Sequence, residues 1–276
     1  MAITDYLPKD LFAGKTVFVT GGGSGINLGV ARCFASLGAG VGICGRTAER
    51  LERARGELEA LGAKVATAVA DVRDYAALEA ALAHAAAELG PVHTLVCGAA
   101  GNFVAPAEEL SANGFKAVVD IDLLGSFNAA RAAFAQLKET RGNVVFISAG
   151  QSFTPYFAQV HVGAAKAGVD QLMRNLALEW GRFGIRVNSV APGPIEGTEG
   201  VRRLAPGDEG FHRRFRASIP LGRLGTAEEI GQVAVFLASP LASYVTGALL
   251  VADGGQNLPG SGLLTHLIRQ TMAGGS

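Results

Sequence analysis

The feature that most constrains the fold is a regular alternation of short apolar runs with longer amphipathic ones along the first part of the chain. Buried strands are predicted at residues 15–20, 41–44, 65–70 and 94–97. Helices are predicted between them at 26–37, 47–61 and 75–89. Strands that alternate with helices in this way form βαβ units with right-handed connections, and helices cover both faces of their parallel sheet. The sequence therefore predicts an α/β fold.

The second part of the chain continues this pattern. Helices are predicted at 115–137, 160–182 and 226–237, and strands at 143–148, 185–190 and 248–252. Thr47 and Thr226 are expected as helix N-caps. The polar segment 192–221 is long enough to be a substrate lid, and the C-terminal tail, 256–276, is expected to contain a short helix at 263–272. With 276 residues and no repeat or linker, the chain is predicted to be a single domain, 1–276.

Composition argues against several classes of protein. The formal net charge is zero, so a nucleic-acid partner is not expected. Cys33, Cys44 and Cys97 have neither metal-ligand nor disulfide spacing, which predicts no metal site and indicates a reducing compartment. The N-terminus does not resemble a signal peptide, no apolar run is long enough for a membrane span, and the final tripeptide is not a peroxisomal signal. A cytoplasmic protein is expected.

A glycine-rich turn joins the first predicted strand to the first helix. Its residues are Gly21, Gly23, Ser24, Gly25 and Ile26. Glycines at this place let backbone N–H groups approach a pyrophosphate, and the N-terminus of the following helix adds a favourable dipole. The strand–turn–helix context favours a dinucleotide site. The alternative is a tight turn that binds no ligand.

The end of the second strand indicates which dinucleotide. A site that prefers NAD usually has an acidic residue here for the ribose 2′-hydroxyl. This chain has Arg46 and no acid. An arginine can bind a 2′-phosphate through two hydrogen bonds, so NADP(H) is predicted. The alternative is a solvated surface arginine.

With these features, the chain resembles the short-chain dehydrogenase/reductase family over nearly its full length. The matching stretches are Thr20-Gly-Gly-Gly-Ser-Gly25-Ile, Asp71-Val72, Gly98-Ala-Ala-Gly101, Lys166 and Asn188-Ser-Val-Ala-Pro192-Gly-Pro-Ile. The resemblance implies a Rossmann-like, doubly wound sheet of seven parallel strands with helices on both faces. It also implies cofactor contacts at Asp71 (the adenine end), Val72, Ala99, Lys166 (the nicotinamide ribose), Pro192, Gly193, Pro194, Ile195 and Thr198.

The catalytic positions of that family are unusual in this chain. Mapped by motif, the asparagine position holds Asp122, the serine position Ala149 and the tyrosine position Val162, while Lys166 retains the family residue. Two of these substitutions remove hydroxyls that carbonyl reduction needs, one to polarise the carbonyl and one to protonate the alkoxide. An ordinary ketone or alcohol substrate is therefore not expected.

Within the family, the chain looks like the 2,4-dienoyl-CoA reductases of the peroxisomal type. The shared pieces include Ala99-Ala-Gly-Asn102-Phe103, Val119-Asp-Ile-Asp122, Gln159-Val-His161, the motif of residues 193–200, and residues 238–255. Two positions depart from the pattern: Asn27 replaces the third glycine of the phosphate turn, and Cys97 replaces an asparagine after the fourth strand. With no peroxisomal signal, this likeness suggests a bacterial, cytoplasmic relative.

The likeness implies NADPH-dependent reduction of a 2,4-dienoyl-CoA to a 3-enoyl-CoA in the β-oxidation of unsaturated fatty acids. Hydride would add to C5, the dienolate would be stabilised at the thioester oxygen, and C2 would be protonated. Asp122 is the best candidate for the acid, directly or through a water, and the alternative is that Asp122 is a structural carboxylate on its helix. The oxyanion donor stays open among Gln151, His161 and the nicotinamide ribose hydroxyl. Acyl-CoA contacts are implied at Arg46, Arg73, Phe103, Ser111, Ala112, Asn113 and Arg203. A homotetramer assembled through the helices at 115–137 and 160–182 is the family expectation.

Two other functions stay open at this point. One is reduction of a different activated alkene, such as a 2-enoyl-CoA, in the same site. The other is a non-catalytic protein that binds the cofactor but has lost its acid. Retention of both Asp122 and Lys166 argues against the second.

Overall fold

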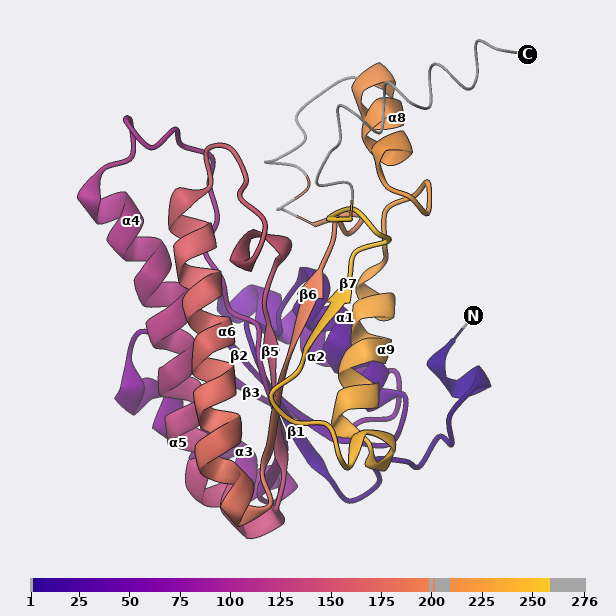
Figure 1. The fold of residues 1–276 in the computed structure, drawn as a ribbon. Coiled ribbons are helices and arrows are strands. Elements are labelled where there is room, and N and C mark those ends of the chain that lie inside the picture. The colour runs from indigo at the N-terminus through magenta and orange to yellow at the C-terminus, as the bar shows by residue number, and fades with distance from the viewer. Residues whose placement is uncertain (1, 199–200, 202–208, 259–276) are drawn as a thin grey trace.

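The computed structural model describes residues 2–198, 201 and 209–258. Its centre is one sheet in the order β3-β2-β1-β4-β5-β6-β7, with every neighbouring pair parallel (Figure 1). The strands are β1 (Thr16–Thr20), β2 (Gly40–Gly45), β3 (Val65–Val69), β4 (Val92–Cys97), β5 (Asn143–Ile147), β6 (Arg186–Pro192) and β7 (Leu249–Ala252). The predicted seven-stranded, doubly wound sheet is confirmed.

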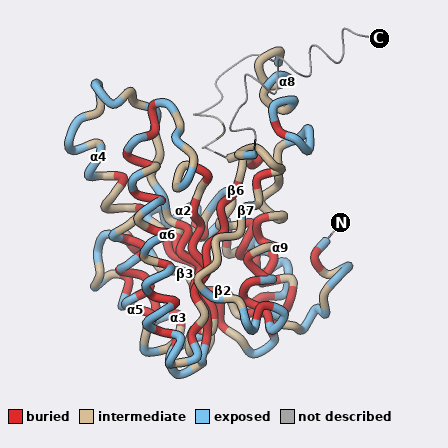
Figure 2. Tube along the Cα trace, viewed as in Figure 1, coloured by how far each residue is buried: buried red, intermediate tan, exposed pale blue. Residues whose placement is uncertain are grey.

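Helices cover both faces of this sheet. One face is packed by α1 (Gly25–Ala35), α2 (Ala48–Glu59) and α9 (Ala227–Ala238), and the other by α3 (Tyr75–Leu89), α5 (Gly125–Thr140) and α6 (Val160–Trp180). A hydrophobic core lies on each face of the sheet, and β1 contributes side chains to both. Val17 and Val19 pack under α1, α2 and α9, and Phe18 packs under α3, α5 and α6. Buried residues accordingly concentrate along the sheet and the inner sides of the helices (Figure 2). This two-sided burial explains why the strands are continuous apolar runs.

Strand order reverses direction between β1 and β4. From β1 the chain builds outward through β2 to β3, and it then returns to place β4 on the other side of β1. The loops after β1 and β4 therefore leave the sheet on opposite faces and open a crevice at the carboxyl ends of the strands. Ligands of open α/β sheets bind in this crevice.

Side-chain caps begin some of the helices but not all of them. Thr226 caps α9 as predicted: its Oγ1 accepts from Glu229 N at 3.2 Å, and its own N donates to Glu229 Oε2 at 2.8 Å. Asp74 caps α3 by accepting from Ala77 N at 3.0 Å. Thr47 is the residue before α2, as predicted, but its side chain makes no capping hydrogen bond.

The long helix predicted at 115–137 is three consecutive pieces. It begins as α4 (Ala112–Val119), widens into one π turn (Asp120–Leu124) and continues as α5 to Thr140. Gly125 lies at the end of the π turn, where a Cβ would come within 2.5 Å of Val72 Cγ2. Ser126 Oγ donates to Asp122 O at 2.5 Å. The helical pattern of the sequence gives no sign of this widened turn, which lies next to the crevice.

The predicted lid at 192–221 contains a helix that the sequence pattern did not reveal. This helix is α8 (Glu209–Ser218), which lies beyond the carboxyl ends of the strands in Figure 1. Residues 199, 200 and 202–208 of the lid and the predicted helix at 263–272 lie outside the described residues. Short 3-10 turns complete the fold at Ile3–Asp5, Gly150–Ser152, Gly181–Phe183 and Pro240–Ala242. No helix in the described part of the chain has the length and apolarity to cross a membrane.

Candidate active site

A cavity of about 830 Å³ occupies the crevice at the carboxyl ends of the strands. Every residue for which the sequence predicted a cofactor contact lines it: Gly21, Gly23, Ser24, Gly25, Ile26, Arg46, Asp71, Val72, Ala99, Lys166, Pro192, Gly193, Pro194, Ile195 and Thr198. These residues come from the ends of five strands and, for Lys166, from α6, and the fold brings them together as one surface. Their individual contacts stay predictions.

The phosphate end of the cavity is built by the turn after β1. Gly21 and Gly25 have positive φ values of 69° and 58°, a conformation that favours glycine. Gly22 packs so closely on β2 that a Cβ would lie 2.6 Å from Ile43 Cγ2. Ser24, the residue before α1, makes no side-chain capping bond, so the first N–H groups of α1 can bind an anion. This turn fits a pyrophosphate.

Arg46 and Asp71 line the end of the cavity predicted to bind adenine, here called the adenine end, and Arg73 pairs with Asp71 beside it. Arg73 binds Asp71 through two hydrogen bonds, Nε to Oδ1 at 3.0 Å and Nη2 to Oδ2 at 2.6 Å. This guanidinium holds the pKa of Asp71 at about 2. Arg46 lines the cavity, whereas Arg73 does not line it. The structure therefore leaves Arg46 accessible to a ligand phosphate and occupies Arg73 with Asp71.

The other described residues predicted to contact substrate do not line the cavity. Phe103 packs its ring on His161, with centroids 4.3 Å apart. Ser111 caps α4 by accepting from Gly114 N at 3.0 Å, and Ser111, Ala112 and Asn113 are exposed. Arg203 lies outside the described residues. Within the described ranges, the cavity lining thus includes Arg46 alone from the predicted substrate set.

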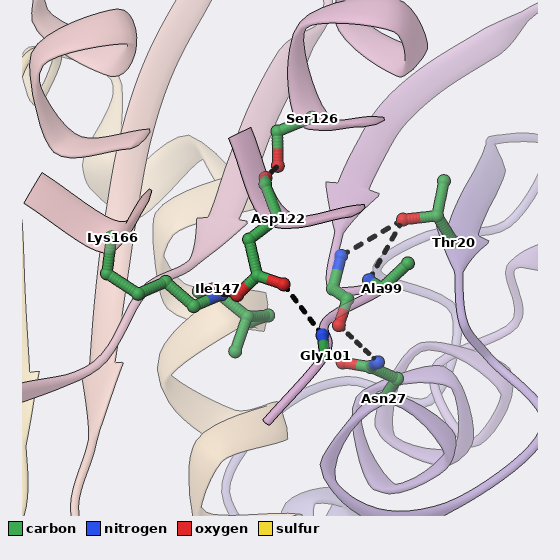
Figure 3. Close-up of polar contacts among 9 residues, drawn as sticks. Thr20, Asn27, Ala99, Gly101, Asp122, Ser126, Ile147 and Lys166 are labelled. Atoms are coloured by element: carbon green, nitrogen blue, oxygen red, sulfur yellow. Dashed lines mark hydrogen bonds and ion pairs between the residues drawn. The ribbon is translucent and has the colours of Figure 1, made fainter. Parts of the chain in front are cut away.

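A buried ion pair lies at the end of the cavity where the sequence predicts the reaction, here called the reacting end. Asp122 Oδ1 accepts from Gly101 N at 2.7 Å, and Oδ2 lies 3.2 Å from Lys166 Nζ (Figure 3). Lys166 Nζ also donates to Ile147 O at 3.0 Å. The Asp122 side chain is 0% exposed and that of Lys166 is 7% exposed. The ammonium contact lacks hydrogen-bond geometry, so Oδ2 has no hydrogen bond.

The two positions without a hydroxyl also line the cavity. Ala149 and Val162 both face it, next to Lys166. Two other hydroxyl residues of the lining were missed from the sequence. Ser148 Oγ is buried without a hydrogen-bond partner, while Tyr156 OH donates to Asn257 Oδ1 at 2.9 Å and burial raises the pKa of Tyr156. Neither residue stands at a family catalytic position, so no motif spacing could have identified them.

The structure separates two of the proposed oxyanion donors. Gln151 lines the cavity, whereas His161 does not. His161 Nε2 contacts Phe103 O at 3.1 Å, and burial lowers the pKa of His161, so its neutral form is favoured. Gln159, another cavity residue, donates to the same carbonyl at 2.7 Å. These contacts support a structural role for His161. Across the described residues, no group of three or more His, Cys, Asp or Glu side chains could hold a metal ion.

Comparisons with known proteins agree with the fold and with the family resemblance. The family model described as "Enoyl-(Acyl carrier protein) reductase" matches residues 21–257. The peroxisomal, (3E)-enoyl-CoA-producing 2,4-dienoyl-CoA reductase of Saccharomyces cerevisiae is 45% identical over 250 residues, which covers 89% of this chain and 85% of the yeast protein. A Bacillus subtilis protein, named a "probable 2,4-dienoyl-CoA reductase" of the (2E)-enoyl-CoA-producing kind, is 41% identical over 88% of this chain and 96% of its own length.

One similar solved structure also has an unusual site. It is a short-chain oxidoreductase of Pseudomonas aeruginosa PAO1 with NADPH bound, described as containing an atypical catalytic center. Its TM-score is 0.83 at 30% identity, and the match covers 88% of this chain and 97% of that one.

Proposed function

The chain belongs to the short-chain dehydrogenase/reductase family, and from this premise we propose that it is an NADPH-dependent reductase of 2,4-dienoyl-CoA thioesters. The observation that carries the proposal is the pairing of a complete dinucleotide cavity with Asp122 and Lys166 at its reacting end, where Ala149 and Val162 supply no hydroxyl. A conjugated thioester suits this site, because its reduction protonates a carbon and forms no alkoxide.

The residues of the cavity fit NADPH. The glycine turn and the uncapped N-terminus of α1 would hold the pyrophosphate, and Arg46 would bind the 2′-phosphate. Pro192 to Ile195 and Thr198 would hold the nicotinamide end, with Lys166 at its ribose. When bound, NADPH supplies a hydride.

The chain's own side chains then handle the proton. We assign Asp122 and Lys166 to deliver it to C2 of the acyl group. Asp122 Oδ2 has no hydrogen bond and can hold a water, and the Lys166 ammonium 3.2 Å away can replace the proton that this water gives up. Gly101 N–H fixes the other oxygen, so the carboxylate cannot turn away. A water relay therefore accounts for these contacts better than direct transfer from Asp122.

Protonation at C2 gives a 3-enoyl-CoA, whereas protonation at C4 gives a 2-enoyl-CoA. The yeast and Bacillus relatives differ in this respect by name. We propose the 3-enoyl product, with a role in the β-oxidation of unsaturated fatty acids in the cytoplasm. Deuterium from D₂O is then expected at C2 of the product, and deuterium at C4 would instead indicate the 2-enoyl route.

We also propose a homotetramer. Large apolar side chains are exposed along the helices expected to form its interface, namely Phe115, Leu124 and Phe127 on the α4–α5 stretch and Leu178 on α6. Sedimentation velocity tests this part independently of activity, and a monomer at micromolar concentration would contradict it.

The test of the function is NADPH oxidation with trans-2,trans-4-hexadienoyl-CoA and decadienoyl-CoA. A 3-ketoacyl-CoA and a 2-enoyl-CoA serve as control substrates. Turnover of the dienoyl esters alone is the expected result. Turnover of the ketoacyl ester would mean that another group, such as Tyr156, replaces the missing tyrosine. Turnover of the 2-enoyl ester would indicate an enoyl reductase, and NADPH binding without any turnover would indicate a protein that only binds the cofactor.

A further inference from the structure

The side chain of Asn27 bridges two loops of the cavity. Its Nδ2 donates to Gly98 O at 2.7 Å and lies 3.4 Å from Gly21 O. Because both partners are carbonyl oxygens, the amide has only this orientation. Asn27 Oδ1 is buried and has no hydrogen bond. A glycine at this position could not join the phosphate turn to the loop after β4.

The loop that receives this bond also carries the hydrogen bond to the catalytic carboxylate. Its first N–H groups, those of Gly98 and Ala99, donate to Thr20 Oγ1 at 3.1 and 3.3 Å. At its other end, Gly101 N donates to Asp122 Oδ1 (Figure 3). The loop is therefore fixed to β1 and α1 where it begins and to Asp122 where it ends. A Cβ on Gly98 would overlap Asn27 Oδ1, so the two loops touch closely.

We propose that Asn27 is a positioning residue that ties the phosphate-binding turn to the loop that orients Asp122. Asn27 need not touch the reacting atoms. It sets the place of Gly98 and, through Ala99 and Ala100, the place of the Gly101 N–H that holds Asp122 Oδ1. Loss of the tie lets this N–H and the carboxylate shift together, which slows proton delivery while the glycine turn still binds NADPH. This inference deepens the proposed function and rests on it.

The test compares Asn27→Ala with Asn143→Ala. Alanine suits the interior of α1, so helix propensity is not the cause of any loss. Asn143 is a matched control at the opposite end of the sheet: its Nδ2 also donates to the protein (Thr94 Oγ1, 3.1 Å), and its Oδ1 is also buried without a hydrogen bond. A third variant, Asn27→Asp, keeps the volume of the side chain but places an acceptor against two carbonyls.

Two kinds of measurement distinguish a role of Asn27 in positioning the 98–101 loop from a role in packing alone. The first is hydrogen exchange of the 98–101 loop, which needs no substrate. The second is kcat with saturating NADPH across pH, together with the Kd of NADPH. For Asn27→Ala we expect loop exchange to rise and kcat to fall by about tenfold each, the size of one lost hydrogen bond. The pH midpoint of kcat should shift, while the Kd of NADPH changes by less than about threefold.

Asn143→Ala should lower stability and leave loop exchange, kcat and its pH midpoint unchanged. Asn27→Asp should lower kcat at least as much as Asn27→Ala, because a lost bond and not an empty volume is the cause. The proposal is overturned if Asn27→Ala leaves loop exchange unchanged, if its kcat and NADPH affinity fall by one common factor, or if Asn27→Asp restores kcat. Failure of the wild-type protein to reduce dienoyl-CoA would instead sink the proposed function, while the exchange comparison would still decide whether the tie exists.

Discussion

Two carboxylate–cation pairs lie at the two ends of the cavity, one partly exposed to solvent and the other buried. Asp71 and Arg73, at the adenine end, are 27% and 44% exposed and are joined by two hydrogen bonds. Asp122 and Lys166, at the reacting end, are 0% and 7% exposed, and their 3.2 Å contact lacks hydrogen-bond geometry. Solvent screens the first pair, whereas the second has lost its hydration and depends on its partners. The pair with the better hydrogen-bond geometry is therefore expected to influence stability and chemistry less.

The largest effect is expected from Lys166→Met. This change leaves Asp122 buried without its cation, which costs about 3–5 kcal/mol of unfolding free energy and removes activity. Urea unfolding and NADPH oxidation measure the two effects. Lys116→Met is the control, because Lys116 pairs with Asp120 on the exposed side of the same helical stretch and should cost less than about 1 kcal/mol. Equal losses in the two variants would contradict the comparison.

Asp122→Asn tests the charge of the buried pair alone, because asparagine keeps the shape of the aspartate side chain. The new side chain can still accept from Gly101 N–H, but it lacks the negative charge that would hold the proposed relay water beside Lys166. We expect kcat with a dienoyl-CoA to fall about a hundredfold or more, with the Kd of NADPH little changed. The matched control is Asp120→Asn, two residues earlier and paired with Lys116, which should keep full activity. An active Asp122→Asn variant would show that this carboxylate is not needed.

Arg46→Ala tests the adenine end, where the sequence predicts a 2′-phosphate contact. Loss of a charged hydrogen-bonding group should raise the KM for NADPH by roughly ten- to a hundredfold. NADH lacks the phosphate and is the internal control, so its KM should stay the same. If both values rise together, Arg46 contributes to folding of the site and not to recognition of the phosphate.

The smallest effect is expected from Arg73→Ala. The pKa of Asp71 is about 2, below its ordinary value of 3.8, so the pair stabilises the fold above about pH 4 and loses this contribution as pH falls through about 2. Because both side chains are partly exposed, the variant should lose no more than about 1 kcal/mol at neutral pH. Unfolding free energies at pH 7 and pH 3 should show this difference shrinking at the lower pH. A difference that grows toward acid would mean that the pair is not its source.

The two ends of the cavity also differ in how much of their structure the sequence predicts. The sheet, its covering helices and the residues of the cofactor cavity are local patterns: β-branched runs, glycine turns and strand ends. Their positions follow from the chain one element at a time. The pairing of Arg73 with Asp71 adds a contact over two residues, which spacing alone could have suggested.

The reacting end depends on contacts between distant segments. Asp122 turns inward at a π turn, and one widened turn leaves no trace in an apolar pattern that fits a continuous α-helix. Tyr156 enters the cavity beside Asn257, which is 101 residues later in the chain. The sequence also identified Asn27 as a departure from the family pattern, but its partner Gly98 is apparent only from the packed loops. Sequence motifs identify the residues of this end of the cavity, but their contacts are seen only in the folded structure.

The packing of Asn27 against Gly98 restricts the order in which this chain can change over evolution. A side chain at position 98 overlaps Asn27 Oδ1, so any substitution of Gly98 is tolerated only after position 27 has become smaller. Reversion of Asn27 to glycine has no such requirement and can occur first. Lineages that share Asn27 should therefore retain Gly98, whereas lineages with glycine at 27 can vary at 98 without this overlap. Position 27 can therefore change first, whereas position 98 can change only after it.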